Sequence, residues 1–97
     1  MEDSCRDLSE AVSLMKALLI GNKRFFHNEV LNSDGRKLYI KILRAVYKHC
    51  PKYRRMLHGL RGVYTLDVVI KVAERILGIS RREVESMLSL SDEQLSP

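Results

Sequence analysis

The sequence has few of the residues that mark secreted or membrane proteins. Its 97 residues include no tryptophan, two prolines and two cysteines, Cys5 and Cys50. Two cysteines are too few for a disulfide framework, so we expect free thiols, with Cys50 packed as a small apolar residue. The longest apolar run, Ala17 to Ile20, is far shorter than the roughly 18 residues that a membrane-spanning helix needs. We therefore expect no contact with a membrane.

The N-terminus also lacks the pattern of an export signal. Residues 1–4 read Met-Glu-Asp-Ser. A secretory signal begins with positive charge followed by an apolar stretch, and transit peptides are poor in acidic residues. The expected location is intracellular, either cytoplasmic or in the nucleus or nucleoid.

Recognisable catalytic motifs are missing as well. The chain has no glycine-rich phosphate loop, no Gly-x-Ser-x-Gly and no His-Glu-x-x-His. Its histidines, His27, His49 and His58, are scattered, and neither they nor Cys50 have the paired spacing of a zinc site. We expect a protein that is not an enzyme and that holds no metal and no cofactor.

What the chain does contain is the composition of one small globular domain. Hydrophobic residues make up 45% and charged residues 30% of the chain. We expect a single helical domain over residues 1–90, followed by a frayed polar tail over 91–97. Apolar residues recur at steps of three and four, which predicts an all-α bundle of four to five helices and no strand. The expected helices cover about 4–20, 36–49, 51–58 and 65–77, with a last one opened by Ser80.

Local signals help to place the ends of these helices. Thr65 has the chemistry of a helix cap, and Ser80 followed by Glu83 has the spacing of a capping box. Residues 32–35 read Asn-Ser-Asp-Gly and are expected to form a turn. Residues 23–31 fit either a short helix or a packed loop.

Positive charge is concentrated in one third of the chain. Residues 35–65 hold nine basic residues and no Asp or Glu, a balance of +9. Residues 1–34 and 66–97 each hold four basic and six acidic residues, so each sums to −2, and the total returns the +5 of the whole chain. The nine cations are our candidate nucleic-acid-binding residues: Arg36, Lys37, Lys41, Arg44, Lys48, Lys52, Arg54, Arg55 and Arg61.

Four of these cations have the spacing of one helical face. They are separated by steps of four, three and four, which places them in a narrow stripe made of Lys37, Lys41, Arg44 and Lys48. Like charges at these steps repel one another, and no acidic residue compensates them. The stripe suits a polyanion, because phosphates would neutralise it and release counterions. The alternatives are a solvated helix face and a surface for an anionic partner protein.

A second pattern lies further along the chain. Residues 72–88 resemble a helix-turn-helix of DNA-binding regulators, with Leu-Gly-Ile-Ser as the turn and Val84 as a packed apolar residue of the second helix. The resemblance implies that the start of the second helix enters the major groove. Arg81 or Arg82 would then bond a guanine edge. Glu74 stands where that family usually has a small residue.

Together, the charge pattern and the resemblance favour a non-enzymatic nucleic-acid-binding protein. The first hypothesis is a DNA-binding transcriptional regulator that uses the basic helical face of residues 36–61. A double-stranded RNA-binding protein is the rival, since duplex RNA is recognised mainly through its shape and backbone. The tyrosines Tyr47, Tyr53 and Tyr64 would add stacking on unpaired bases. The small core also favours a homodimer.

The competing hypothesis is a helical adaptor with an acidic protein partner. Apolar side chains such as Phe25, Leu43 and Tyr47 would then be buried against that partner. Residues 38–44 are similar to the opening of the LYR-motif proteins, helical adaptors that bind acyl carrier protein. Ile40 stands where that family has its arginine.

Overall fold

The computed structural model describes residues 7–59 and 62–89. This part of the chain contains five α-helices of six or more residues: α1 (Ser9–Ile20), α3 (Ser33–His49), α4 (Arg54–Gly59), α5 (Leu66–Leu77) and α6 (Arg81–Ser89). The all-α class expected from the sequence is confirmed. The shorter elements are α2 (Asn22–Phe25), the 3-10 turn η1 (Pro51–Tyr53) and the strands β1 (Phe26–His27) and β2 (Val30–Leu31). The tail expected over 91–97 lies outside the described residues. The first helix was expected to begin near Ser4 but begins at Ser9, because Asp7 and Leu8 are not helical and the Asp7 carboxylate accepts a hydrogen bond from the Ser9 amide.

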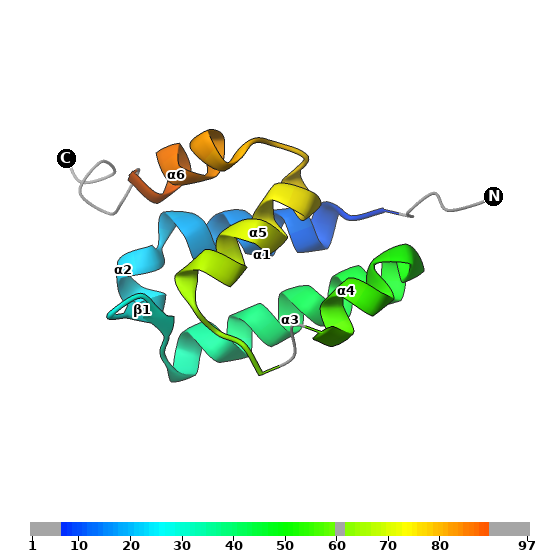
Figure 1. The fold of residues 1–97 in the computed structure, drawn as a ribbon, viewed down its shortest axis with the longest axis horizontal. Coiled ribbons are helices and arrows are strands. Elements are labelled where there is room, and N and C mark those ends of the chain that lie inside the picture. Colours follow the sequence, from blue (N-terminus) through cyan, green and yellow to red (C-terminus); the bar gives the residue numbers. More distant parts are fainter. Residues whose placement is uncertain (1–6, 60–61, 90–97) are drawn as a thin grey trace.

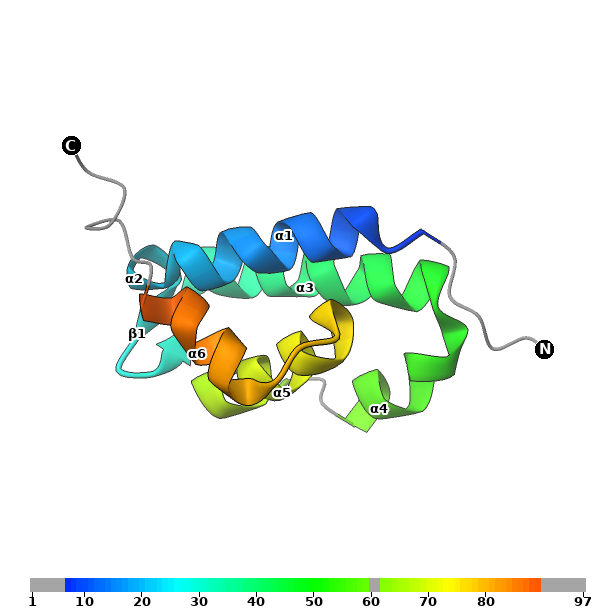
Figure 2. The same cartoon turned by 90° about the horizontal axis from the view of Figure 1, so that it is seen from above.

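The most extensive helix packing joins α1 to α3, and α1 also contacts α5 and α6. Figure 1 shows α3 at one edge of the molecule and α6 at the opposite edge, with α1 and α5 between them. Seen from above, α4 turns back at the far end of α3, away from α6 (Figure 2). The basic residues on α3 and those on α6 therefore belong to helices at opposite edges of the molecule.

One apolar core joins the helices. Each of the four long helices contributes one face to it, and the buried side chains include Met15, Leu18 and Leu19 of α1, Tyr39, Ile42 and Val46 of α3, Val69, Val72 and Ala73 of α5, and Val84 of α6. Burying a side chain of this size stabilises a fold by about 1.5–3 kcal/mol. The buried residues of α3 lie on one side of the helix, which leaves its opposite face free for polar contacts.

The start of α3 differs from the sequence prediction. Residues 32–35 do not form a turn: the helix begins at Ser33, and Asn32 is its N-cap. The Asn32 side-chain oxygen accepts a hydrogen bond from the Gly35 amide at 2.8 Å, and its Nδ2 donates to the Arg24 carbonyl at 2.9 Å. The prediction was wrong because residues that favour turns also favour helix caps.

A glycine is required at position 35 because the backbone of Phe25 lies close to it. The residue is buried, and a Cβ built on it would lie 2.4 Å from the Phe25 carbonyl oxygen. Any side chain here would push α3 away from the end of α2. The glycine therefore serves a close approach of two backbone segments.

Residues 26–31 form a hairpin, so the expectation that the chain has no strand is wrong. Phe26 pairs with Leu31 and His27 with Val30. The two turn residues, Asn28 and Glu29, have positive φ angles of 54° and 65°. Strands of two residues are too short to show the alternating pattern by which strands are predicted.

The hairpin also fixes the chain that leads into α5. The Leu31 amide donates to the Tyr64 carbonyl at 2.9 Å, and the Leu66 amide donates to the Glu29 carbonyl at 2.8 Å. Val30 and Thr65 form an isolated antiparallel bridge between these two bonds. Tyr64 is thereby held close to α3.

The α5–α6 pair follows the sequence prediction closely. Thr65 Oγ1 accepts a hydrogen bond from the Val68 amide at 3.4 Å. Gly78 ends α5 in the left-handed region, with φ at 67°. Ser80 and Glu83 exchange backbone-to-side-chain bonds of 3.0 and 3.2 Å, which is the capping box expected for α6.

Two further features lie at the end of the molecule where α1 begins and α3 ends. The Asp7 carboxylate accepts hydrogen bonds from the amide and hydroxyl of Ser9, and these bonds lower the pKa of Asp7. Cys50 is fully buried, as expected, but the expectation of a free thiol is wrong because this sulfur is disulfide-bonded. The chain has one other cysteine, Cys5, which lies outside the described residues. The number of cysteines excludes a framework but does not decide the state of a single pair.

Candidate nucleic-acid interface

The four-residue stripe is displayed on the outer side of α3. All four side chains are exposed, while Tyr39, Ile42 and Val46 occupy the buried side of the same helix. We call this set the basic row: Lys37, Lys41, Arg44 and Lys48. At 1.5 Å per residue it extends about 16 Å along the helix axis, which corresponds to about five phosphates of one B-form strand.

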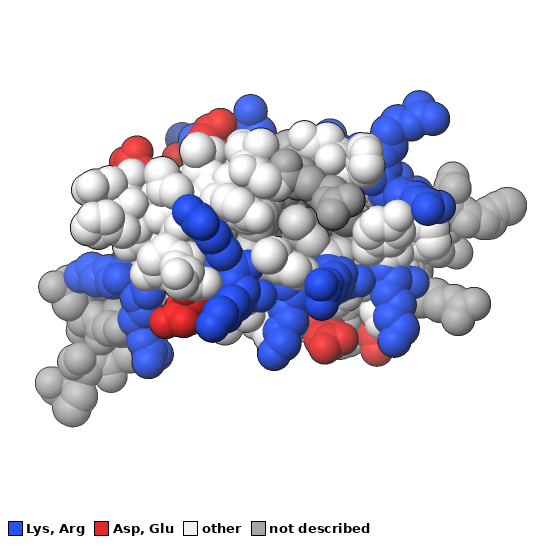
Figure 3. Space-filling view, turned by 90° about the horizontal axis from the view of Figure 1, so that it is seen from below, with Lys and Arg blue, Asp and Glu red and all other residues white. Residues whose placement is uncertain are grey.

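The basic row has no carboxylate partners in the described part of the chain. Ion pairs found there join Lys71 to Asp67 and Arg81 to Asp67 and Glu85, all on α5 and α6. Figure 3 shows Lys and Arg side chains as a blue band across this face, beside a surface of uncharged residues drawn in white. Each like-charge contact at a step of three or four costs a helix about 0.2–0.5 kcal/mol. The row is thus a small internal cost to the fold, and a polyanion would remove it.

Three more of the predicted cations lie on η1 and α4, at the end of the basic row. Arg54 Nε donates to the Tyr47 hydroxyl at 2.7 Å, which links α4 to α3. Lys52 Nζ lies 5.4 Å from the centre of the Tyr53 ring. Arg55 is exposed. These cations lengthen the positive surface beyond α3.

The remaining predicted cations are less uniform. The Arg36 guanidinium lies over the Tyr64 ring, 5.1 Å from its centre, so it is already engaged with the protein. Arg61 lies outside the described residues. Arg82 is exposed on α6.

Arg81 is held by two carboxylates. Its Nε donates to Glu85 at 3.2 Å and its Nη2 to Asp67 at 3.1 Å. The hydrogen bonds that Arg81 donates to Glu85 and Asp67 raise the pKa of Arg81, and the bond from Arg81 is the main cause of the lowered pKa of Asp67. The residue ties the start of α6 to the start of α5. The predicted site residues therefore fall into two surfaces, one on α3 to α4 and one on α6.

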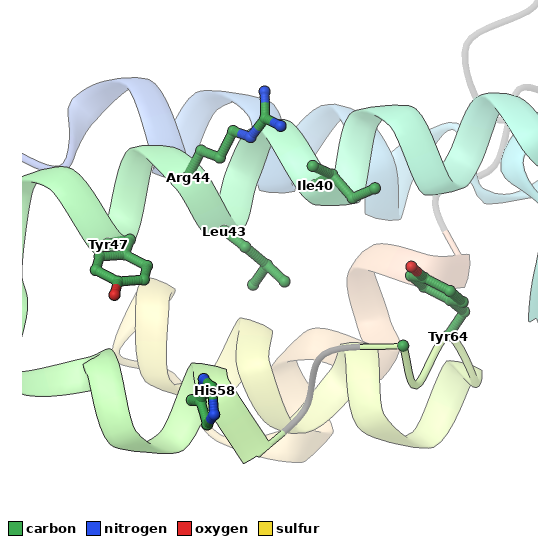
Figure 4. Close-up of a pocket in the computed structure, with 7 residues that line it drawn as sticks. Ile40, Leu43, Arg44, Tyr47, His58 and Tyr64 are labelled. Carbon is green, nitrogen blue, oxygen red and sulfur yellow. The ribbon is translucent and has the colours of Figure 1, made fainter.

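A cleft beside the basic row was not predicted from the sequence. It has a volume of about 390 Å³ and lies between α3 and the segment that follows it, with Ile40, Leu43, Arg44, Tyr47, His58, Gly62 and Tyr64 along its walls. In Figure 4, Leu43 points into the gap, His58 faces it from α4, and the Arg44 guanidinium turns to the outer side. Ile40 and Tyr47 remain 37% and 44% exposed, which is high for large apolar side chains.

One signal in the sequence could have indicated this cleft. Ile40, Leu43 and Tyr47 follow one another at steps of three and four, so they form an apolar row next to the basic one. The opposite wall could not be predicted from the sequence, because Tyr64 is placed at the cleft by hydrogen bonds between its segment and the hairpin. Beneath it, Tyr39 meets the Tyr64 ring edge to face at 6.1 Å.

Tyr39 itself is a buried member of this group. Burial, and to a lesser extent the nearby Tyr64, raises the pKa of Tyr39 to about 12. Its hydroxyl has no hydrogen-bond partner among the described residues. Tyr39 thus stays neutral at physiological pH and serves as a packing partner for Tyr64.

Comparisons with known proteins give no family for the chain. No protein-family model matches it, and neither the curated proteins nor the solved structures yield a match. Within residues 7–59 and 62–89, no helix combines the length and apolar character needed to cross a membrane. The same residues contain no group of three or more His, Cys, Asp or Glu side chains that could hold a metal ion.

Proposed function

We propose that this protein binds nucleic acid through the basic row of α3 and catalyses no reaction. One observation carries the proposal: four exposed cations stand in line on one helix, and none has a carboxylate partner in the described chain. Phosphate groups are the ligands that match such a line, because each contact releases a condensed counterion. The cations of η1 and α4 would add contacts at one end.

The expected binding is governed by charge more than by sequence. Four phosphate contacts predict that the logarithm of affinity falls with the logarithm of salt at a slope of about −3.6 on duplex DNA. Contacts of this kind give dissociation constants of about 1–100 μM at physiological salt. Base readout would need a second surface.

The α5–α6 pair is the candidate for such a second surface, and it supports transcription regulation as a second proposal. The observation in its favour is the arrangement itself: two helices joined through a left-handed Gly78, with Val84 of the second helix fully buried. Of the two arginines, Arg82 is the better base contact, because Arg81 would first have to leave Asp67 and Glu85. An Arg82→Gln variant should then lose sequence preference while keeping its general affinity.

The test is fluorescence anisotropy of a labelled 20-mer, offered as duplex DNA, duplex RNA and single strand at several salt concentrations. The test variant carries Lys37→Gln, Lys41→Gln, Arg44→Gln and Lys48→Gln. The control variant carries Lys16→Gln, Arg24→Gln, Lys71→Gln and Arg75→Gln, none of which belongs to a proposed binding surface. Both sets lower the formal charge from +5 to +1, so they remove the same charge from different places.

We expect the wild type and the control variant to bind at least one ligand at micromolar concentration, with a steep salt slope. The test variant should lose most of that affinity and much of the slope. Equal losses in both variants would show that net charge matters and the basic row does not. Binding weaker than about 100 μM for every ligand would overturn the proposal and favour an acidic protein partner.

A further inference from the structure

We infer that the cleft beside the basic row holds an unpaired base, so that the bound nucleic acid is single-stranded where it crosses this surface. The inference rests on the proposed function and names its substrate class. Its basis is the juxtaposition on one helix of a line of cations and an apolar cleft with a tyrosine ring at each end.

The two features are close enough to contact one nucleotide. The basic row and the apolar row of Ile40, Leu43 and Tyr47 lie about 100° apart around α3, given the helical repeat. Arg44 belongs to both, because it stands in the basic row and also lines the cleft. Its guanidinium turns to the outer side, as Figure 4 shows, while Leu43 points inward. A phosphate on Arg44 therefore places the attached base next to the cleft.

The lining of the cleft suits a flat, largely apolar group. Tyr47 and Tyr64 stand at its two ends, and Ile40 and Leu43 form the wall between them. Aromatic side chains stack on the faces of bases with little regard to sequence. His58 adds a ring nitrogen that can hydrogen-bond a base edge. The volume of about 390 Å³ falls within the range of about 300–1,000 Å³ seen for small-ligand sites.

Both tyrosines already have contacts within the protein before any ligand binds. The Tyr47 hydroxyl accepts the 2.7 Å bond from Arg54. Tyr64 packs edge to face on the buried Tyr39, and its carbonyl is bonded to the Leu31 amide. Rings held in this way lose little conformational freedom on stacking.

The charge of the surface favours this occupant over others. A duplex keeps its bases stacked inside and would offer the cleft no base face. A partner helix could fill an apolar cleft with anchors at i, i+3, i+4 and i+7, but only a helix rich in acidic residues would also match the basic row. An unpaired strand supplies both the phosphates that the basic row needs and the base that the cleft fits.

The experiment compares three ligands of one sequence. They are a 20-mer single strand, the same strand with its central bases removed to leave abasic sugars, and the duplex. The variants are Tyr47→Leu, which removes the ring, and Tyr47→Phe, which keeps it. The chain has no tryptophan, so tyrosine emission gives a second readout that base stacking quenches.

We expect the wild type to prefer the intact single strand to the abasic strand and to the duplex by at least about fivefold, the lower bound for stacking one base. The Tyr47→Leu variant should lose this preference while keeping the salt slope, and Tyr47→Phe should restore it. Only the intact strand should quench tyrosine emission. The abasic strand tests the inference on unaltered protein, so a poorly folded variant would not decide the outcome.

Failure of the inference and failure of the proposed function look different. Equal binding of all three ligands, unchanged by Tyr47→Leu, would overturn the base-binding cleft and leave the phosphate-binding function standing. An equal loss for all three ligands in Tyr47→Leu would also overturn it, because the ring would then act only by holding Arg54. Absence of binding to every ligand would overturn both, and binding of an acidic helical peptide in its place would make the cleft a protein-docking site.

Discussion

The two surfaces that carry the predicted cations treat charge in opposite ways. On α5 and α6, Arg81 and Lys71 are matched by nearby carboxylates within the described chain. On α3, the four cations of the basic row have no carboxylate partner among the described residues. Lysine and arginine therefore stabilise the fold on α5 and α6, whereas on α3 their mutual repulsion destabilises the helix slightly. A surface kept at a small cost to its own helix is the better candidate for an external ligand.

The largest expected effect concerns how firmly α3 is anchored. Gly35→Ala would place a Cβ 2.4 Å from the Phe25 carbonyl oxygen. Relieving that overlap requires the start of α3 to move, and we expect a loss of about 3 kcal/mol or more in the free energy of unfolding, at the upper end for overpacking. Urea denaturation followed by circular dichroism measures it.

The matched control for this change is Gly59→Ala on α4. A Cβ there meets nothing within 4 Å. We expect its stability to stay within about 1 kcal/mol of the wild type, with a small gain from the stiffer unfolded chain. If both alanines cost the same, the close approach at Gly35 would not be what anchors α3.

Next in size is the cap of α6. Ser80→Ala removes one half of the capping box with Glu83, and we expect a loss of about 1 kcal/mol in unfolding free energy. Binding of nucleic acid through α3 should not change. Ser33→Ala, at an exposed position in the first turn of α3, should stay within about 0.5 kcal/mol. A loss of phosphate binding in Ser80→Ala would show that the surface on α3 depends on the surface on α6.

The basic row itself gives a prediction of opposite sign. Replacing its four cations by glutamine removes three like-charge contacts, which together cost about 1 kcal/mol. We therefore expect the variant to be more resistant to urea by that amount at low salt, even as it loses its ligand. A clear loss of stability would mean that these cations hold the fold, and the contrast with α5–α6 would disappear.

The smallest effect is a pH dependence at Asp67. Its folded pKa lies below the usual 3.8, chiefly because Arg81 donates to it. The stability that this gives is present above pH 3.8 and is lost as pH falls through the lower folded value. Asp67→Asn should therefore lose less stability than the wild type on acidification from pH 7, as urea midpoints at several pH values would show. Identical acid sensitivity would mean that the Arg81 contact contributes nothing.

How far the sequence predicted this structure depended on the range of each signal. The signals for the helices and for the Ser80–Glu83 capping box are local, because they depend on residues within four positions of each other. The presence of these helices and of the box was confirmed. The predicted start of α3 was wrong because the residues from Asn32 to Gly35 suit a turn and a helix cap equally well. The sequence did not show that the predicted cations lie on two separate surfaces. Arg81 is held by Asp67, which is 14 positions away in the sequence and meets it only in the fold. The cleft was missed for the same reason, since Tyr47 and Tyr64 come from segments joined only by tertiary contacts.

The bond from the Leu31 amide to the Tyr64 carbonyl joins two residues that are 33 positions apart in the sequence. Bringing two such points of the flexible unfolded chain together costs about 3 kcal/mol in chain entropy. Folding has already met this cost before any ligand arrives, so the cleft is preorganised. Association would then be limited by diffusion and electrostatic steering rather than by rearrangement of the protein.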